Sequence, residues 1–230
     1  MEAGGRLLGS DSLCLAVFYL IPVRRVRELA PEPLRILEAV PGYTLGGIYA
    51  SRYGKPGLAA LSELSLLQSY VEHGGRRGFL VRPLCAERGG GEPCGDPGVF
   101  SWSPGDSGKE GKRLALEVTS GGTSLISLTM RPLLTGVPYN GNIPFLCSKG
   151  GNVVHFQNHF ISKVGISTTR VAIPEGSMLR DFPFGMKVLS AFWDASNVIV
   201  KEPEFAPVRG IKRAENVLGD PIGKGICKGR

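Results

Sequence analysis

The segment Glu63-Leu-Ser-Leu-Leu predicts one strand. A tight turn and a second strand beside the first are predicted by the segment that follows, Gly74-Gly-Arg-Arg-Gly-Phe-Leu-Val-Arg82. Residues 61–71 and 79–87 are both rich in apolar side chains. The run of glycine and arginine between them contains no apolar residue, which is typical of a turn. We therefore expect an antiparallel hairpin whose two strands present alternate side chains to opposite faces of a sheet.

Further strand patterns recur at short intervals, without the long helical segments of a parallel α/β fold. The chain contains 33 glycines and 17 prolines, which also favours short strands joined by turns. The expected strands are residues 13–23, 43–53, 114–118, 125–130, 153–164 and 186–200, with a short helical turn at 24–29 and irregular segments at 88–96 and 131–151. The fold class is therefore mainly β, and we expect an antiparallel, closed or partly closed β-barrel with few short helices.

Composition divides the chain into three parts. Residues 1–12 are Gly-rich and are expected to be flexible, residues 13–202 carry the strand patterns of one barrel domain, and residues 203–230 form a basic, Gly-rich tail. A single β domain of this length is common, so no second domain is expected.

The net charge of +7 is partly concentrated in the tail. Between residues 209 and 230, six basic residues stand against two acidic ones, and no aromatic residue interrupts them. Binding of single-stranded nucleic acid usually needs aromatic stacking groups, so nucleic acid is not the expected partner, and a solvated tail is the simpler interpretation.

The five cysteines show neither the spacing of a zinc site nor an even disulfide framework. Cys14 and Cys85 lie in apolar runs, where a thiol usually acts as a small hydrophobic side chain. Residues 13–21 form the longest apolar run, which is too short to span a bilayer and carries the wrong flanking charges for a signal peptide. We therefore expect a reduced, cytoplasmic setting without a membrane.

Two further segments complete a family pattern. Tyr19-Leu-Ile-Pro-Val-Arg-Arg-Val-Arg-Glu-Leu-Ala-Pro31-Glu-Pro-Leu34 precedes the hairpin, and Gly95-Asp-Pro-Gly-Val99 follows it. Over residues 13–202 the chain resembles the acetoacetate decarboxylase superfamily. In that family a strand leads into a Pro-Glu-Pro-Leu turn, a glutamate opens the next strand, and a Gly-Arg-Arg-Gly-aromatic hairpin follows. The resemblance implies the acetoacetate decarboxylase-like barrel, a keto acid ligand, self-assembly into a homo-oligomer and no separate cofactor.

The resemblance also implies that the family's reactive amine is missing. The lysine pair that supplies the Schiff base falls on Gly98 and Val99, neither of which carries an amine. Lys109 and Lys112 are the nearest lysines, but they lie in a polar turn, where an amine stays protonated near pH 7. Lys187 is a more distant candidate, with an ordinary surface lysine as its alternative interpretation.

Of the polar positions in the family's site, only one is kept. The family's second carboxylate falls on Gly47 or Ile48, and its N-terminal arginine falls near Ser12, so neither charge is present. Glu63 matches the retained glutamate. The resemblance therefore implies the fold without the parent reaction.

Glu63 and Arg82 are the candidate site residues. If Glu63 faces the barrel interior, its carboxylate needs a partner or a raised pKa; the alternative is a wet position at a strand end. Arg82 interrupts an apolar run, and its guanidinium could pair with Glu63, bind a ligand carboxylate or phosphate, or reach solvent. We favour the internal ion pair slightly.

The three histidines do not indicate a metal site. His155 and His159 are four residues apart on an expected strand, which separates them by about 13 Å, too far to chelate one ion. His73 lies in the turn and is expected to be exposed.

Three functional hypotheses remain open. The first is a small-molecule protein that binds a keto acid or another carbonyl or carboxylate compound through Glu63 and Arg82, with or without lysine-independent chemistry. The second is an active decarboxylase or related lyase that uses a lysine from elsewhere. The third is a non-enzymatic binding or assembly protein with a packed interior. Whether the protein is an enzyme, and what the basic tail does, is left undecided by the sequence.

Overall fold

The computed structural model describes residues 5–9, 12–55, 58–87, 96–105, 113–149, 152–201 and 204–207. Strands dominate it, and the one α-helix is a single turn. The elements in chain order are β1 (Gly5–Gly9), β2 (Ser12–Pro22), α1 (Val23–Val26), the 3-10 turn η1 (Arg27–Leu29), β3 (Arg35–Ile36), β4 (Tyr43–Lys55), β5 (Leu58–His73), β6 (Arg76–Ala86), β7 (Asp96–Gly105), β8 (Arg113–Ser120), β9 (Thr123–Lys149), β10 (Asn152–Ala172), β11 (Met186–Lys201) and β12 (Glu204–Pro207). The predicted fold class, mainly β with few short helices, is confirmed.

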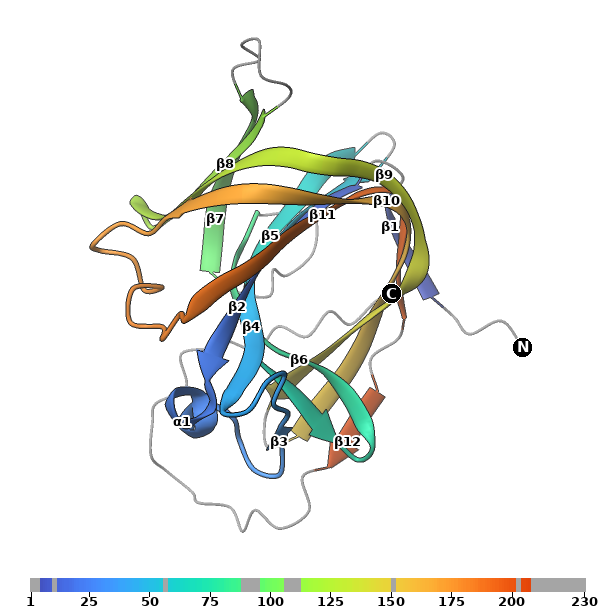
Figure 1. Ribbon diagram of the computed structural model, residues 1–230. Helices are drawn as coiled ribbons and strands as arrows, with labels where there is room; N and C mark the ends of the chain where they lie inside the picture. The colour runs from blue at the N-terminus through green and yellow to red at the C-terminus, as the bar shows by residue number, and fades with distance from the viewer. Residues whose placement is uncertain are drawn as a thin grey trace.

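The strands form one sheet that closes on itself. Its order is β1-β11-β2-β4-β5-β6-β7-β8-β9-β10-β12, and the pairing of β10 with β11 closes a ring of nine of the described strands. Most pairs are antiparallel, but β6 pairs in parallel with β7 and with β9, so the sheet is mixed and not wholly antiparallel as predicted. Figure 1 shows β9 and β10 arching together over the remaining strands. The closed barrel predicted from sequence is therefore present, with a mixed sheet.

The hairpin predicted around residues 73–78 is confirmed. β5 and β6 pair from Glu63–Ala86 to His73–Arg76, and Gly74 and Gly75 between them have positive φ angles of 57° and 78°. The helical turn predicted at residues 24–29 is also present, as α1 and η1.

The segment 131–151, predicted to be irregular from its prolines, is instead mostly strand. β9 runs through Pro132, Pro138 and Pro144 and pairs along this length with β10. From residue 131 to 144 no other described strand pairs with β9. A strand with one partner tolerates proline, because the missing N–H can face the unpaired side.

Strands also form beyond the predicted domain limits. Gly5–Gly9, in the segment expected to be flexible, pairs with β11, and Glu204–Pro207, in the expected tail, pairs with β10. Both extend an existing sheet edge, so main-chain hydrogen bonds order them where side-chain patterns give little signal. The basic residues 209–230 lie outside the described residues. No helix in the described part is long and apolar enough to cross a membrane.

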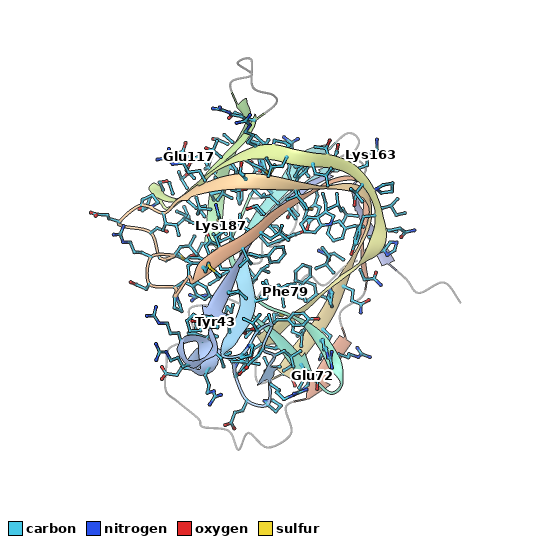
Figure 2. The ribbon with its side chains drawn as sticks, in the orientation of Figure 1. Tyr43, Glu72, Phe79, Glu117, Lys163 and Lys187 are labelled. Atoms are coloured by element: carbon cyan, nitrogen blue, oxygen red, sulfur yellow. The ribbon has the colours of Figure 1, made fainter. Side chains whose placement is uncertain are left out.

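The central strands β2, β4 and β5 bury apolar side chains on both faces. One face contributes Val17, Ile48 and Leu64 to a first core beneath β7, β8 and the beginning of β9. The other face contributes Cys14, Tyr49 and further side chains to a second core beneath the later part of β9, β10 and β11. Figure 2 shows side chains filling the space enclosed by the arch.

Gly47 lets β2 and β4 approach one another. It lies opposite Phe18 with a φ of 153°, and a Cβ atom there would come within 1.9 Å of the Val17 carbonyl oxygen. A side chain would therefore push apart two strands that separate the cores. Gly42, in the preceding turn, also has a positive φ, 78°, but a Cβ atom there would meet nothing within 4 Å.

The glycine pair gives a test of this packing. We expect Gly47→Ala to destabilise the protein by about 3 kcal/mol or more, because backbone strain and a main-chain clash add. Gly42→Ala should cost only about 1 kcal/mol, because its strain is not accompanied by a clash. Urea unfolding of the two variants measures the difference; equal losses would contradict the close approach of β2 and β4.

Candidate functional site

Glu63 lies on the face of β5 that points toward the second core. It pairs with Ser51 of β4, whose hydroxyl donates to Glu63 Oε1 at 3.1 Å. The Tyr53 hydroxyl donates to the same oxygen at 2.9 Å. Both donors use Oε1, so Oε2 is left without a hydrogen-bond partner among the described residues. The carboxyl group is partly buried and faces the interior, which is one of the two alternatives that the sequence left open.

The hydroxyl groups continue into an ordered chain. Tyr49 and Tyr53 hydroxyls are 3.2 Å apart, and the Cys14 thiol interacts with Tyr49. Because Tyr53 donates its proton to Glu63, its oxygen is left to accept from the Tyr49 hydroxyl. Donation therefore runs from Tyr49 through Tyr53 to the carboxyl group.

Burial controls the protonation of this chain. It raises the pKa of Glu63, and the hydrogen bonds from Tyr53 and Ser51 offset part of that rise. Burial likewise raises the pKa of Cys14 to about 12 and the pKa of Tyr49 well above 10.0. No described basic side chain forms an ion pair with Glu63, so among the described residues hydroxyl groups alone offset the effect of burial on its pKa.

Four buried polar atoms on the same interior side lack a protein hydrogen-bond partner. Three of them are hydroxyl or amide oxygens, and the fourth is an indole N–H; they belong to Ser12, Asn158, Ser162 and Trp193. Trp193 pairs with Cys14 across β2 and β11 and belongs to the second core, where its ring also contacts Phe160. Buried polar atoms are rarely left unsatisfied, so these are positions for water or for a ligand.

Sequence reasoning missed these four residues. The available signal was the alternation Asn158, Phe160, Ser162, which puts two polar side chains on the same strand face as an aromatic one. Ser12 was named only as the place of the family's N-terminal arginine. It does share the interior face with Glu63, through the alternation of Ser12 and Cys14 on β2.

Neither predicted position of the second carboxylate could serve Glu63. A side chain at Gly47 would meet the Val17 carbonyl, and Ile48 points into the first core. Gly98 of β7 packs against Cys85, also in the first core, and Val99 is 64% exposed. The positions that correspond to the family's lysine pair therefore do not face Glu63.

The predicted ion pair between Glu63 and Arg82 is wrong. Arg82 pairs with Leu66, and the register slips by one residue of β6 between the Leu64 and Ser65 pairs. Since Leu66 and Glu63 have opposite parity on β5, Arg82 projects from the other face of the sheet. It is exposed and lines a hollow with Gln68.

Neither of the two lysines whose side chains the structure describes reaches the interior. Lys163 and Lys187, both labelled in Figure 2, are exposed, and the Lys187 ammonium donates to the Thr169 carbonyl oxygen. Lys109 and Lys112 lie outside the described residues. Cys14 and Cys85 are buried free thiols, as predicted.

The histidines are arranged differently from the prediction. His73 is half-buried and not exposed: its Nδ1 lies 3.0 Å from Nε2 of His155, so the two rings share a hydrogen bond. His159 is bonded to the Asn142 side chain instead. Among the residues that the structure describes, no three His, Cys, Asp or Glu side chains gather as a metal site requires.

Sequence comparisons find no relative for this chain: no protein-family model matches it, and no curated protein matches it. Several solved structures are similar to it in fold. The enduracididine biosynthesis enzyme MppR with bound HEPES superposes with a TM-score of 0.62 at 13% identity, covering 87% of each chain, and the same enzyme has been solved with pyruvate. An acetoacetate decarboxylase-like enzyme from Sphingomonas wittichii gives 0.58 at 13% identity, covering 85% of this chain and 91% of that one. Acetoacetate decarboxylase from Legionella pneumophila gives 0.55 at 12% identity, covering 89% and 88%.

The buried carboxyl group predicts a pH-dependent stability. The folded-state pKa of Glu63 lies above its ordinary value of 4.5, so its contribution to stability is complete below that value and is lost as pH rises through the folded-state pKa. Glu63→Gln keeps an oxygen for Ser51 and Tyr53 but does not ionise. We expect its free energy of unfolding to rise relative to the wild type between pH 4 and pH 8, as urea titrations at each pH would show.

Glu72 supplies a control of opposite sign. Hydrogen bonds from Arg35 and Arg77 lower the pKa of Glu72, so its contribution is present above its ordinary pKa and is lost as pH falls. Glu72→Gln should therefore lose stability relative to the wild type as pH rises. A parallel trend in both variants would contradict the placement of Glu63.

Proposed function

We propose that this acetoacetate decarboxylase-like fold holds a small carbonyl compound inside the barrel, beside Glu63, and forms no imine with it. The observation that carries the proposal is Glu63 itself: a partly buried carboxyl group with one oxygen occupied by two hydroxyl donors and the other unused. A carboxyl group with a raised pKa and a free oxygen is suited to donate or accept a proton at a bound ligand.

The surrounding polar groups favour an uncharged carbonyl over a carboxylate. The Trp193 indole N–H has no protein partner and can donate to a carbonyl oxygen. Ser12 stands where the family has its arginine, and no described basic side chain pairs with Glu63. A keto acid would therefore bring its negative charge next to a carboxyl group without a compensating cation. The likeness to MppR, which has been solved with pyruvate, supports only the carbonyl part of such a ligand, because pyruvate also carries a carboxylate.

The same groups suit a reaction that needs no amine. Ionised Glu63 can accept a proton from the carbon next to the carbonyl, while the Trp193 N–H stabilises the negative charge that develops on the carbonyl oxygen. The reverse proton transfer completes an enolisation without any covalent intermediate. The competing proposals are a decarboxylase with a lysine from outside the described residues and an assembly protein with a packed interior.

Tryptophan fluorescence tests the binding. Trp102→Phe leaves Trp193 as the sole tryptophan, because the chain has two. Titration of this variant with butanone should give a saturable change in emission, and 2-oxobutanoate, the keto acid of equal length, should bind at least about tenfold more weakly. Adding Glu63→Gln should change butanone affinity little, because a ketone has no proton to donate to the carboxylate, but it should stop the exchange of the protons next to the carbonyl with D2O, because an amide is not a base. No saturable change with either compound would favour a packed interior.

Borohydride trapping tests the chemistry. After incubation with acetoacetate or pyruvate and sodium borohydride, we expect the intact mass of the protein to be unchanged, because neither Lys163 nor Lys187, the lysines whose side chains are described, faces the interior. An authentic acetoacetate decarboxylase labelled under the same conditions is the control. An adduct on one lysine would reject the amine-independent proposal and identify the nucleophile.

A further inference from the structure

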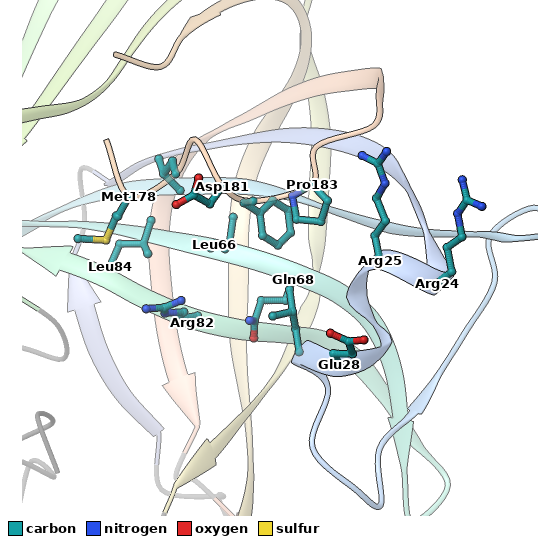
Figure 3. A pocket seen from close by; sticks show the side chains of 13 residues that line it. Arg24, Arg25, Glu28, Leu66, Gln68, Arg82, Leu84, Met178, Asp181 and Pro183 are labelled. Atoms are coloured by element: carbon teal, nitrogen blue, oxygen red, sulfur yellow. The ribbon is translucent and has the colours of Figure 1, made fainter. Parts of the chain in front are cut away.

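A hollow lies on the opposite side of the β5–β6 pair from Glu63. It has a volume of about 460 Å³ and is walled by β5, β6, the α1–η1 turn and the segment that precedes β11 (Figure 3). Arg82, misplaced by the sequence prediction, projects into it. The proposed carbonyl site does not use this hollow.

The floor of the hollow is apolar and buried. Leu66 and Leu84 come from the paired strands, and Leu179 and Phe182 come from the segment before β11. All four are buried members of the first core. An apolar group of a ligand would therefore meet a surface that is already ordered, which lowers the entropic cost of binding.

The polar wall carries charges of both signs that do not pair with one another. Figure 3 shows Arg82, Gln68 and Glu28 on one side of the hollow and Asp181 across it. Within the described residues, neither Arg82 nor Glu28 nor Asp181 forms an ion pair. Elsewhere on the surface, neighbouring opposite charges do pair, as Glu72 does with Arg35 at 2.8 Å and with Arg77 at 3.0 Å.

We propose that this hollow binds a small zwitterion, an α-amino acid with an apolar side chain. The guanidinium of Arg82 offers a planar pair of donors to the ligand carboxylate, and the Gln68 amide stands beside it. Asp181 and Glu28 offer carboxylate oxygens to the ligand ammonium group. The apolar side chain then lies on Leu66 and its neighbours.

A simple anion fits the hollow less well than a zwitterion. An anion would satisfy Arg82 but would leave Glu28 and Asp181 near a third negative charge. Arg24 and Arg25 also line the hollow, and Figure 3 places them at its rim, apart from Arg82. They add positive charge at the entrance, where it increases the rate of encounter more than the affinity.

Calorimetry on the full chain tests the charge requirement. We expect L-leucine or L-methionine to bind, and two analogues of leucine to bind at least about tenfold more weakly, since each lacks one charge-assisted contact. These are 4-methylpentanoate, which has no ammonium group, and 3-methylbutylamine, which has no carboxylate. Equal affinity for L-leucine and 4-methylpentanoate would overturn the zwitterion proposal, as would the absence of heat from both amino acids at about 10 mM.

Matched variants test the position. Arg82→Gln and Asp181→Asn should each weaken L-leucine binding at least about tenfold while keeping the melting temperature of the wild type, since both side chains are exposed. Arg170→Gln removes an exposed arginine from β10, outside the hollow, and should leave the affinity unchanged. Equal loss in all three variants would reject this position. Glu63→Gln should not change L-leucine binding, so failure at this hollow and failure of the carbonyl site can be told apart.

Discussion

The rest of the structure depends on the burial of three strands, β2, β4 and β5, on both faces. A strand with one buried face needs apolar side chains at every second position, but these strands need them at nearly every position. The Leu-rich runs of the sequence meet that need, and the arch of β9 and β10 covers the second face. The polar side chains that remain on these strands are then enclosed with the apolar ones. This enclosure raises the pKa of Glu63.

A carboxyl group inside such a sheet is costly unless other groups stabilise it. Here hydroxyl groups take that role, and no basic side chain among the described residues does. Hydroxyl donors hold the carboxylate in place without fixing its charge, so protonation stays available to a ligand. An arginine at the position of Ser12 would hold the carboxylate ionised instead. Under the proposed function, this difference in partner favours an uncharged carbonyl compound over a keto acid.

Much of the fold could be predicted from the sequence, because apolar alternation and turn residues are local signals. The hairpin after Glu63 and the helical turn before Pro31 are examples. The predicted ion pair between Glu63 and Arg82 was wrong because a one-residue slip in register exchanges the two faces of a strand. No local pattern in the sequence reveals such a slip. The strand through Pro138 was predicted to be irregular. That prediction failed because tolerance of proline depends on how many neighbours a strand has, which is a property of the whole sheet. Trp193 was missed because an unsatisfied N–H becomes visible only when every neighbour is in place.

The prolines of β9 also bear on how the molecule behaves among its own copies. Between residues 131 and 144 this strand has a long side without a described partner, where another chain could add a strand and begin an aggregate. Pro138 and Pro144 are six residues apart, so with regular alternation both remove an N–H from the same side of the strand. A neighbouring strand would find a donor missing at both positions along this side. The residues that made the segment look irregular thus make this side of the strand a poor template for another strand.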